Sequence, residues 1–209
     1  MLLEHQGKRP HIHETAYIAP TATVCGDVTI GVESRVLFGA VLVAEGGPVT
    51  IGGHCIIMEQ AVLRGTARHP VRLADHVLVG PQVGPHAHLS DCTVEESVFV
   101  ATGACVFNGA RLGDRSEVRI NGVVHVNTAV PAGATVPIDW VAVGDPAQIL
   151  AHNEHEHIWA VQKTLEFPRT VFGLARAPEG ESIMPEMTRR YARALGSHRH
   201  DHVLGHHHL

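Results

Sequence analysis

Residues 94–136 read VEESVFVATGACVFNGARLGDRSEVRINGVVHVNTAVPAGATV. A branched aliphatic residue recurs there at every sixth position, at Val94, Val100, Val106, Leu112, Val118, Val124, Val130 and Val136. A six-residue step fits neither the helical period of about 3.6 nor the alternation of one long strand, so it indicates short strands separated by turns that restart the pattern. The segment therefore predicts an all-β solenoid built from hexapeptide repeats.

The same period continues towards the N-terminus in separate blocks. Its aliphatic positions are Ile18, Val24, Ile30, Val36, Leu42, Ile51, Ile57, Leu63, Leu73, Val79 and Leu89. The phase breaks at 44–48, 64–70 and 81–85, where turn-forming residues predict loops inserted between coils. A glycine follows the aliphatic residue at Gly31, Gly52, Gly80 and Gly113, which we interpret as tight turns that favour glycine.

The C-terminal part of the chain has a different, helical pattern. Asn153 is the expected N-cap of a helix over 152–167, whose apolar face is formed by Ile158, Val161 and Leu165. A second helix is expected over 185–195. Because the terminal coils of a solenoid expose unpaired edges, we interpret these helices as a cap.

These patterns predict three regions. Residues 1–150 form the β-helix domain and 151–196 the helical cap. Residues 197–209 carry six of the 18 histidines and are expected to be a disordered tail that could chelate metal adventitiously.

The composition excludes several classes of protein. The 16 Lys and Arg residues are outnumbered by 21 Asp and Glu residues and form no basic cluster, so no nucleic-acid partner is expected. No apolar run approaches the roughly 18 residues that span a bilayer. The four cysteines form no C-x-x-C pair and follow no signal peptide, which predicts reduced thiols and a cytoplasmic location.

The hexapeptide repeat occurs together with three short motifs. They are Glu45-Gly46-Gly47-Pro48-Val49-Thr50-Ile51-Gly52, Cys92-Thr93-Val94 and Val143-Gly144-Asp145-Pro146-Ala147. Over about residues 10 to 150 the chain resembles the gamma-class carbonic anhydrases. The resemblance implies a left-handed parallel β-helix that forms a homotrimer and a zinc ion held between subunits by three histidines.

The residues at the family's functional places differ in this chain. Where the family has Arg-Gly-Asp, this chain has Val43-Ala44-Glu45, and the family's Gln-Asp pair is replaced by Met58-Glu59. The place of the first zinc histidine is taken by Arg64.

A gapless alignment puts Pro85 and Ser90 at the second and third zinc places, and a shifted register would put Pro81 and His86 there instead. Neither register retains three ligands. Because a catalytic zinc needs three protein ligands, the resemblance predicts a degenerate metal site and argues against ordinary carbonic anhydrase activity.

Glu59, Arg64 and His86 are the candidate catalytic residues. Arg64 could bind a carboxylate or phosphate while Glu59 acts as general acid or base, or the two could form an inter-subunit salt bridge, and Glu45 suits the same bridging role. His69, His88 and His125 are weaker candidates for metal binding. Each of them could also be an ordinary surface or interface histidine.

Three functions remain open at this point. The first is a metal-free relative of the gamma-class carbonic anhydrases with a structural or small-anion-binding role. The second is an enzyme that handles acyl groups or thioesters, with a histidine as base, because hexapeptide folds also include acyltransferases. The third is a rewired metalloenzyme in which His69, His86 or His88 supplies rearranged zinc ligands.

Overall fold

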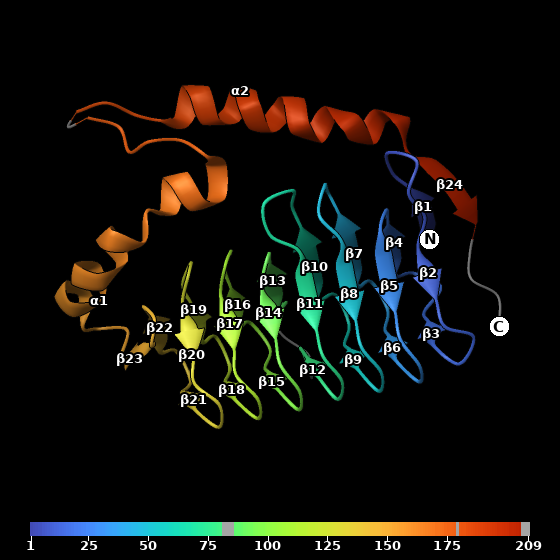
Figure 1. Ribbon diagram of the computed structural model, residues 1–209, viewed down its shortest axis with the longest axis horizontal. Coiled ribbons are helices and arrows are strands. Elements are labelled where there is room, and N and C mark those ends of the chain that lie inside the picture. The colour runs from blue at the N-terminus through green and yellow to red at the C-terminus, as the bar shows by residue number, and fades with distance from the viewer. Residues whose placement is uncertain (81–85, 179, 206–209) are drawn as a thin grey trace.

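The computed structural model describes residues 1–80, 86–178 and 180–205. The chain winds into a left-handed parallel β-helix whose short strands stack in three sheets, and its C-terminal segment folds back along one side of the stack (Figure 1). This confirms the predicted solenoid.

The strands divide among the sheets in coil order. The ten-stranded sheet contains β1 (Leu2–Glu4), β4 (Thr23–Cys25), β7 (Val41–Ala44), β10 (Val62–Gly65), β13 (His88–Ser90), β16 (Cys105–Val106), β19 (Val123–Val124), β22 (Val141–Val143), β23 (Gln148–Leu150) and β24 (His202–Gly205). One seven-stranded sheet contains β2 (His11–Ile12), β5 (Val28–Ile30), β8 (Val49–Ile51), β11 (Val71–Leu73), β14 (Thr93–Val94), β17 (Arg111–Leu112) and β20 (Ala129–Val130). The other contains β3 (Tyr17–Ile18), β6 (Arg35–Val36), β9 (Ile56–Ile57), β12 (Leu78–Val79), β15 (Phe99–Val100), β18 (Glu117–Val118) and β21 (Thr135–Val136).

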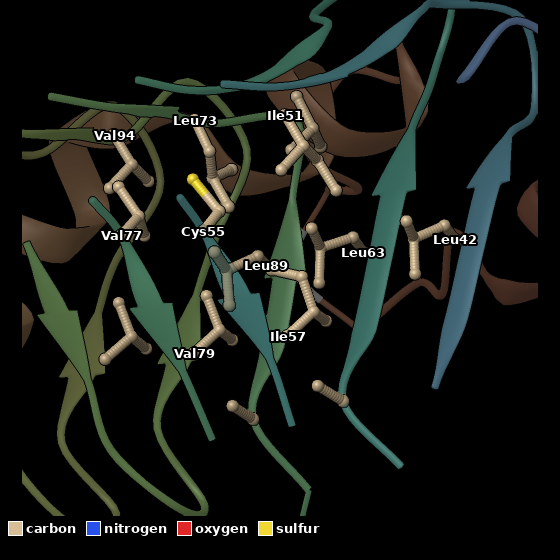
Figure 2. Close-up of a cluster of buried hydrophobic side chains, with 14 of the residues drawn as sticks. Leu42, Ile51, Cys55, Ile57, Leu63, Leu73, Val77, Val79, Leu89 and Val94 are labelled. Carbon is tan, nitrogen blue, oxygen red and sulfur yellow. The ribbon is translucent and has the colours of Figure 1, made fainter. Parts of the chain in front are cut away.

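The aliphatic ladder forms the core. Every ladder position from Ile18 to Val136 is at most 5% exposed. Figure 2 shows side chains such as Leu42, Leu63 and Leu89, from neighbouring strands of one sheet, lying towards Ile57 and Val79 of another inside the helix. Branched aliphatic side chains suit this interior because they fill the space between three close walls and carry no polar atom that would need a partner.

Two loops interrupt the coils where the phase breaks, at residues 45–48 and 66–70, as predicted. The third predicted loop, 81–85, lies outside the described residues. At Gly31 and Gly113, close packing between coils, and not the predicted tight turn, explains the glycine. An added Cβ would lie 2.5 Å from the Gly52 oxygen at Gly31 and 2.5 Å from the Ala132 nitrogen at Gly113. Neighbouring coils therefore approach too closely there for a side chain, whereas Gly80 does adopt a positive φ of 74°.

The C-terminal segment contains helix α1 (His155–Gln162), the 3₁₀ turn η1 (Lys163–Leu165), the π turn η2 (Pro168–Phe172), helix α2 (Met184–Leu195) and the 3₁₀ turn η3 (Gly196–His200). The second predicted helix is confirmed. The first is shorter than predicted, and Glu154 rather than Asn153 is its N-cap, without a capping side-chain bond. The backbone N–H of Ala151 instead donates to the Glu154 carboxylate.

Both ends of the ten-stranded sheet are covered by antiparallel strands. β23 pairs with β22 at one end, and β24 pairs with β1 at the other. Residues 202–205, which the sequence places in a disordered tail, thus form an edge strand, because α2 carries the chain back along the β-helix to the first coil (Figure 1). Such pairing satisfies backbone groups that an open solenoid end would expose.

Candidate functional site

In the ten-stranded sheet, the residue that directly follows the inward-facing aliphatic residue of each coil points outward. These residues stack in one column on the outer face of the sheet. Arg64 in β10 lies directly between Val43 in β7 and Ser90 in β13. This register places Ser90, not His86, beside Arg64. Pro81 and Pro85 lie outside the described residues.

Arg64 forms an ion pair with Glu45. Its Nη1 donates to both Glu45 carboxylate oxygens, at 3.0 and 3.1 Å, and lies 3.1 Å from the Tyr191 hydroxyl on α2. The Glu45 side chain is only 6% exposed. The predicted acid, Glu59, instead occupies an exposed turn after β9. The structure therefore brings Arg64 together with Glu45 rather than with Glu59.

Ser90 is held by His88 from the same strand. The two residues alternate onto one face of β13, and His88 Nε2 lies 2.7 Å from Ser90 Oγ. Burial, followed by the Arg64 charge, lowers the pKa of His88. His88 is therefore neutral at pH 7 and binds the serine hydroxyl rather than a carboxylate.

The other predicted residues are dispersed. His86 is exposed ahead of β13, and His69 is half-buried in the loop after β10. That loop is fixed by buried Asp91, which accepts hydrogen bonds from the backbone N–H and hydroxyl of Thr66 and from the Asn108 amide. Burial raises the pKa of Asp91 despite these bonds. These hydrogen bonds anchor the loop.

A polar chain continues from Glu45 to the N-terminal edge of the sheet. His198 Nε2 lies 3.4 Å from Glu45 Oε1, and His198 Nδ1 lies 2.8 Å from Asp201 Oδ2. Asp201 also approaches His5 Nδ1 at 2.5 Å and accepts a hydrogen bond from Cys25 Sγ at 3.6 Å. Sequence reasoning did not find this group, because up to 196 positions separate its members.

Charge is balanced within this group. Burial opposes ionisation of Asp201, but the hydrogen bonds from His5 and His198 outweigh it and hold the carboxyl pKa below its usual value. Burial likewise opposes protonation of His198, and its two acidic neighbours outweigh that effect and raise its pKa. Burial and the nearby Asp201 charge raise the pKa of the Cys25 thiol to about 12.

An apolar cavity of about 760 Å³ lies further along the same face, between the sheet and the C-terminal segment. The sheet contributes Phe107 and His125, whose rings are 6.2 Å apart, and Phe167 packs 6.0 Å from His125. The remaining lining residues are Cys105, Val123, Trp159, Gln162, Pro168 and Arg176. The cavity is thus mostly apolar, with a few polar groups and one cation.

His125 is the main polar group of this cavity. It lies two coils from Ser90, and its Nε2 is 2.7 Å from the Gln162 side-chain nitrogen. Burial lowers the pKa of His125, an effect partly offset by the backbone of Val126. The Arg176 guanidinium lies 5.6 Å from the centre of the Trp159 ring. A neutral imidazole and a guanidinium could orient a ligand that has an apolar body and a polar end.

The donor set at the expected zinc place does not fit the ion. A guanidinium has no lone pair for a metal, and that of Arg64 is committed to Glu45. Its neighbour Ser90 offers only a hydroxyl. Among the described residues, His69, His86, His88 and His125 belong to no group of three or more clustered His, Cys, Asp or Glu ligand atoms.

Comparison with known proteins gives several gamma-class carbonic anhydrases among the relatives of this chain. The chain is 28% identical over 210 residues to gamma carbonic anhydrase 1 of Arabidopsis thaliana mitochondria, across 95% of this chain and 72% of that protein. It is 30% identical to a carbonic anhydrase of Geobacillus kaustophilus, across 54% of this chain and 60% of that protein. The chain thus covers less than two thirds of the second relative. No family model matches the sequence.

A solved structure supports the fold. The crystal structure of a proposed acetyltransferase from Bacillus cereus has a TM-score of 0.52 and 24% identity, across 78% of this chain and 90% of that chain.

Proposed function

We propose that this chain, which is similar to gamma-class carbonic anhydrases and folds as a hexapeptide-repeat β-helix, does not hydrate carbon dioxide. Arg64 stands at the place where the family holds its metal. In this proposal its role there is structural, because Arg64 and Glu45 together fasten the C-terminal segment to the β-helix.

The contact between Arg64 and Glu45 carries the proposal. Arginine stays protonated at any physiological pH, and here it stands where the family has its first zinc histidine. The adjacent carboxylate neutralises its charge, and the Tyr191 hydroxyl on α2 takes part in the same contact. A small anion would have to displace Glu45, so a structural role is better supported than anion binding.

Hydration of carbon dioxide by the full chain, incubated with zinc, tests the first part. We expect no rate above that of zinc in buffer, because the donor set leaves no three-ligand site with an open position. Saturable turnover that Arg64→Gln abolishes would overturn the proposal.

The structural role is tested separately by hydrogen exchange. Arg64→Gln should raise exchange across residues 184–195, because Arg64 Nη1 donates to the Tyr191 hydroxyl on α2, and it should leave residues 155–162 unchanged. Arg111→Gln, which removes an exposed ion pair with Asp145, is the matched control and should leave α2 unchanged. Equal exchange in α2 for both variants would contradict a structural role for Arg64.

The cavity around His125 favours a second function, the binding or transfer of an acyl compound. Its volume and aromatic lining suit a short acyl chain, while Arg176 and Gln162 could hold a polar end. His125, kept neutral by burial, is a suitable general base for such chemistry.

Titration with a short-chain acyl coenzyme A and with free coenzyme A tests this second function. The acyl compound should change the fluorescence of Trp159 in the cavity wall, and Trp159→Phe should remove most of the signal. Phe107→Glu should weaken binding by placing a charge inside the cavity. Absence of binding of either compound at millimolar concentration would exclude the function.

A further inference from the structure

Four side chains with metal-binding atoms meet where the C-terminal segment reaches the first coils. They are His5 after β1, Cys25 at the end of β4, and His198 and Asp201 in and after η3. Their ligand atoms all lie within 4.8 Å of one another, and His5 and Cys25 are each 2% exposed. Within 1–80, 86–178 and 180–205, this is the one such group of three or more residues.

We propose that these four residues form a structural zinc site that fastens residues 198–201 to the first coils of the β-helix. Zinc bonds of about 2.0–2.3 Å in a tetrahedron place ligand atoms about 3–4 Å apart, and the present separations range from 2.5 Å, between His5 Nδ1 and Asp201 Oδ1, to no more than 4.8 Å. Only small side-chain shifts are therefore needed to accommodate the ion.

The chemistry of the donors selects zinc over harder ions. Two imidazoles, one thiolate and one carboxylate form a set that suits zinc, whereas magnesium and calcium prefer oxygen ligands. The Cys25 thiol would release its proton to solvent when zinc binds, and the resulting thiolate and the Asp201 carboxylate together would neutralise the charge of the ion. Four protein ligands leave no open position, so the site is closed and has no catalytic water.

The surroundings of His198 provide the outer contact that metal-binding histidines usually have. Its Nδ1 faces Asp201, while its Nε2 lies 3.4 Å from Glu45. A proton on Nε2 donated to this carboxylate leaves the Nδ1 lone pair free for the ion. Glu45 is itself held by Arg64, so the ion pair at the former metal place supports the ligand geometry of the new site.

Zinc would act as a cross-link between distant parts of the chain. His5 and Asp201 are 196 positions apart, and Cys25 and Asp201 are 176 apart. Closing such long loops restricts the unfolded chain strongly. The ion would strengthen the pairing of β24 with β1 that covers the end of the ten-stranded sheet.

Zinc content of the full chain tests the proposal. The parent for this test carries His206→Ala, His207→Ala and His208→Ala, which remove adventitious ligands near the C-terminus. After incubation with zinc and dialysis, we expect about one zinc per chain. Cys25→Ser and Asp201→Asn should each lower this content several-fold. Cys105→Ser and His202→Ala, which change a thiol and an imidazole outside the group, should leave it unchanged.

Cobalt substitution gives a second, spectroscopic measurement. The parent loaded with cobalt should show a thiolate-to-cobalt charge-transfer band, which disappears in Cys25→Ser and persists in Cys105→Ser. If Cys25→Ser does not fold, the band in the parent and its loss in Asp201→Asn decide the question. A parent without stoichiometric metal, or an unchanged content in both ligand variants, would mean that the four residues form only a hydrogen-bond network. The carbon dioxide assay is independent of either result.

Discussion

At the scale of single residues, Arg64 determines the contacts of its neighbours. An imidazole at this place could share a metal, but a guanidinium needs anionic or carbonyl partners, and the carboxylate of Glu45 lies one coil away on the same face. Glu45 is nearly fully buried, so Arg64 takes the place of the water that would otherwise contact its carboxylate. Removing either partner would leave the charge of the other without a counter-charge, and this loss would destabilise the fold.

Glu45→Ala should lower stability by about 2 kcal/mol, less than the 3–5 kcal/mol typical of fully buried pairs because Arg64 is partly exposed. In a chain of this size that corresponds to a fall in Tm of about 4–8 °C by thermal unfolding. Glu59→Ala, on an exposed turn, is the control and should change stability by no more than about 0.5 kcal/mol. Equal shifts for the two variants would show that the ion pair contributes nothing.

His125 predicts how stability depends on pH. Burial lowers the pKa of His125 in the folded state, so the unfolded chain binds more protons just below the ordinary histidine pKa of about 6.5. Stability is therefore lost as pH falls through that value and levels off below the folded-state pKa. Between pH 8 and 5, the Tm of thermal unfolding should fall less steeply for His125→Gln than for the native chain. Parallel curves would contradict this account.

At the scale of the elements, the coils are so close that some strand ends exclude any side chain. Gly31 and Gly113 face the backbone of the next coil, while Gly196, at the end of α2, has no atom within 4 Å of an added Cβ. Close packing therefore requires glycine at these two positions of the β-helix, whereas no such contact requires it at Gly196.

Gly31→Ala should destabilise the chain by about 1–3 kcal/mol, because the methyl group would push neighbouring coils apart. Gly196→Ala should instead be neutral or stabilise by up to about 1 kcal/mol, since its φ of −59° suits alanine. Thermal unfolding of both variants measures the contrast. A harmless Gly31→Ala would mean that the coils yield more easily than the close contact indicates.

At the scale of the whole molecule, large apolar side chains remain exposed along the β-helix. They include Val32, Phe38, Ile56, Ile120 and Ile138, with Ile138 55% exposed. Scattered apolar residues are common on protein surfaces, but several along one elongated body suit contact with further copies of the chain. No helix among the described residues is long and apolar enough to cross a membrane.

The expected homotrimer is tested by light scattering coupled to size-exclusion chromatography. The measured mass should be three times the 22.5 kDa of one chain. Phe38→Lys and Ile138→Lys should weaken assembly if these side chains lie between subunits, whereas Tyr17→Lys, on the first coil, is a comparison at another place. A monomeric mass at micromolar concentration would remove the basis for any site between subunits.

The sequence alone determined the scaffold of this protein. A six-residue repeat of branched aliphatic residues is a local pattern, and it is sufficient because each coil contacts only its neighbours. The same reasoning placed the loops that interrupt the coils at residues 45–48 and 66–70.

Only the tertiary structure decided which side chains meet. Glu45 rather than Glu59 pairs with Arg64, because the strand register and not the nearest charge in the sequence sets the distance. The cavity at His125 and the group of His5, Cys25, His198 and Asp201 exist because the C-terminal segment returns along the β-helix. Contacts across up to 196 positions leave no periodic signal in a sequence, since they depend on where a separate element packs.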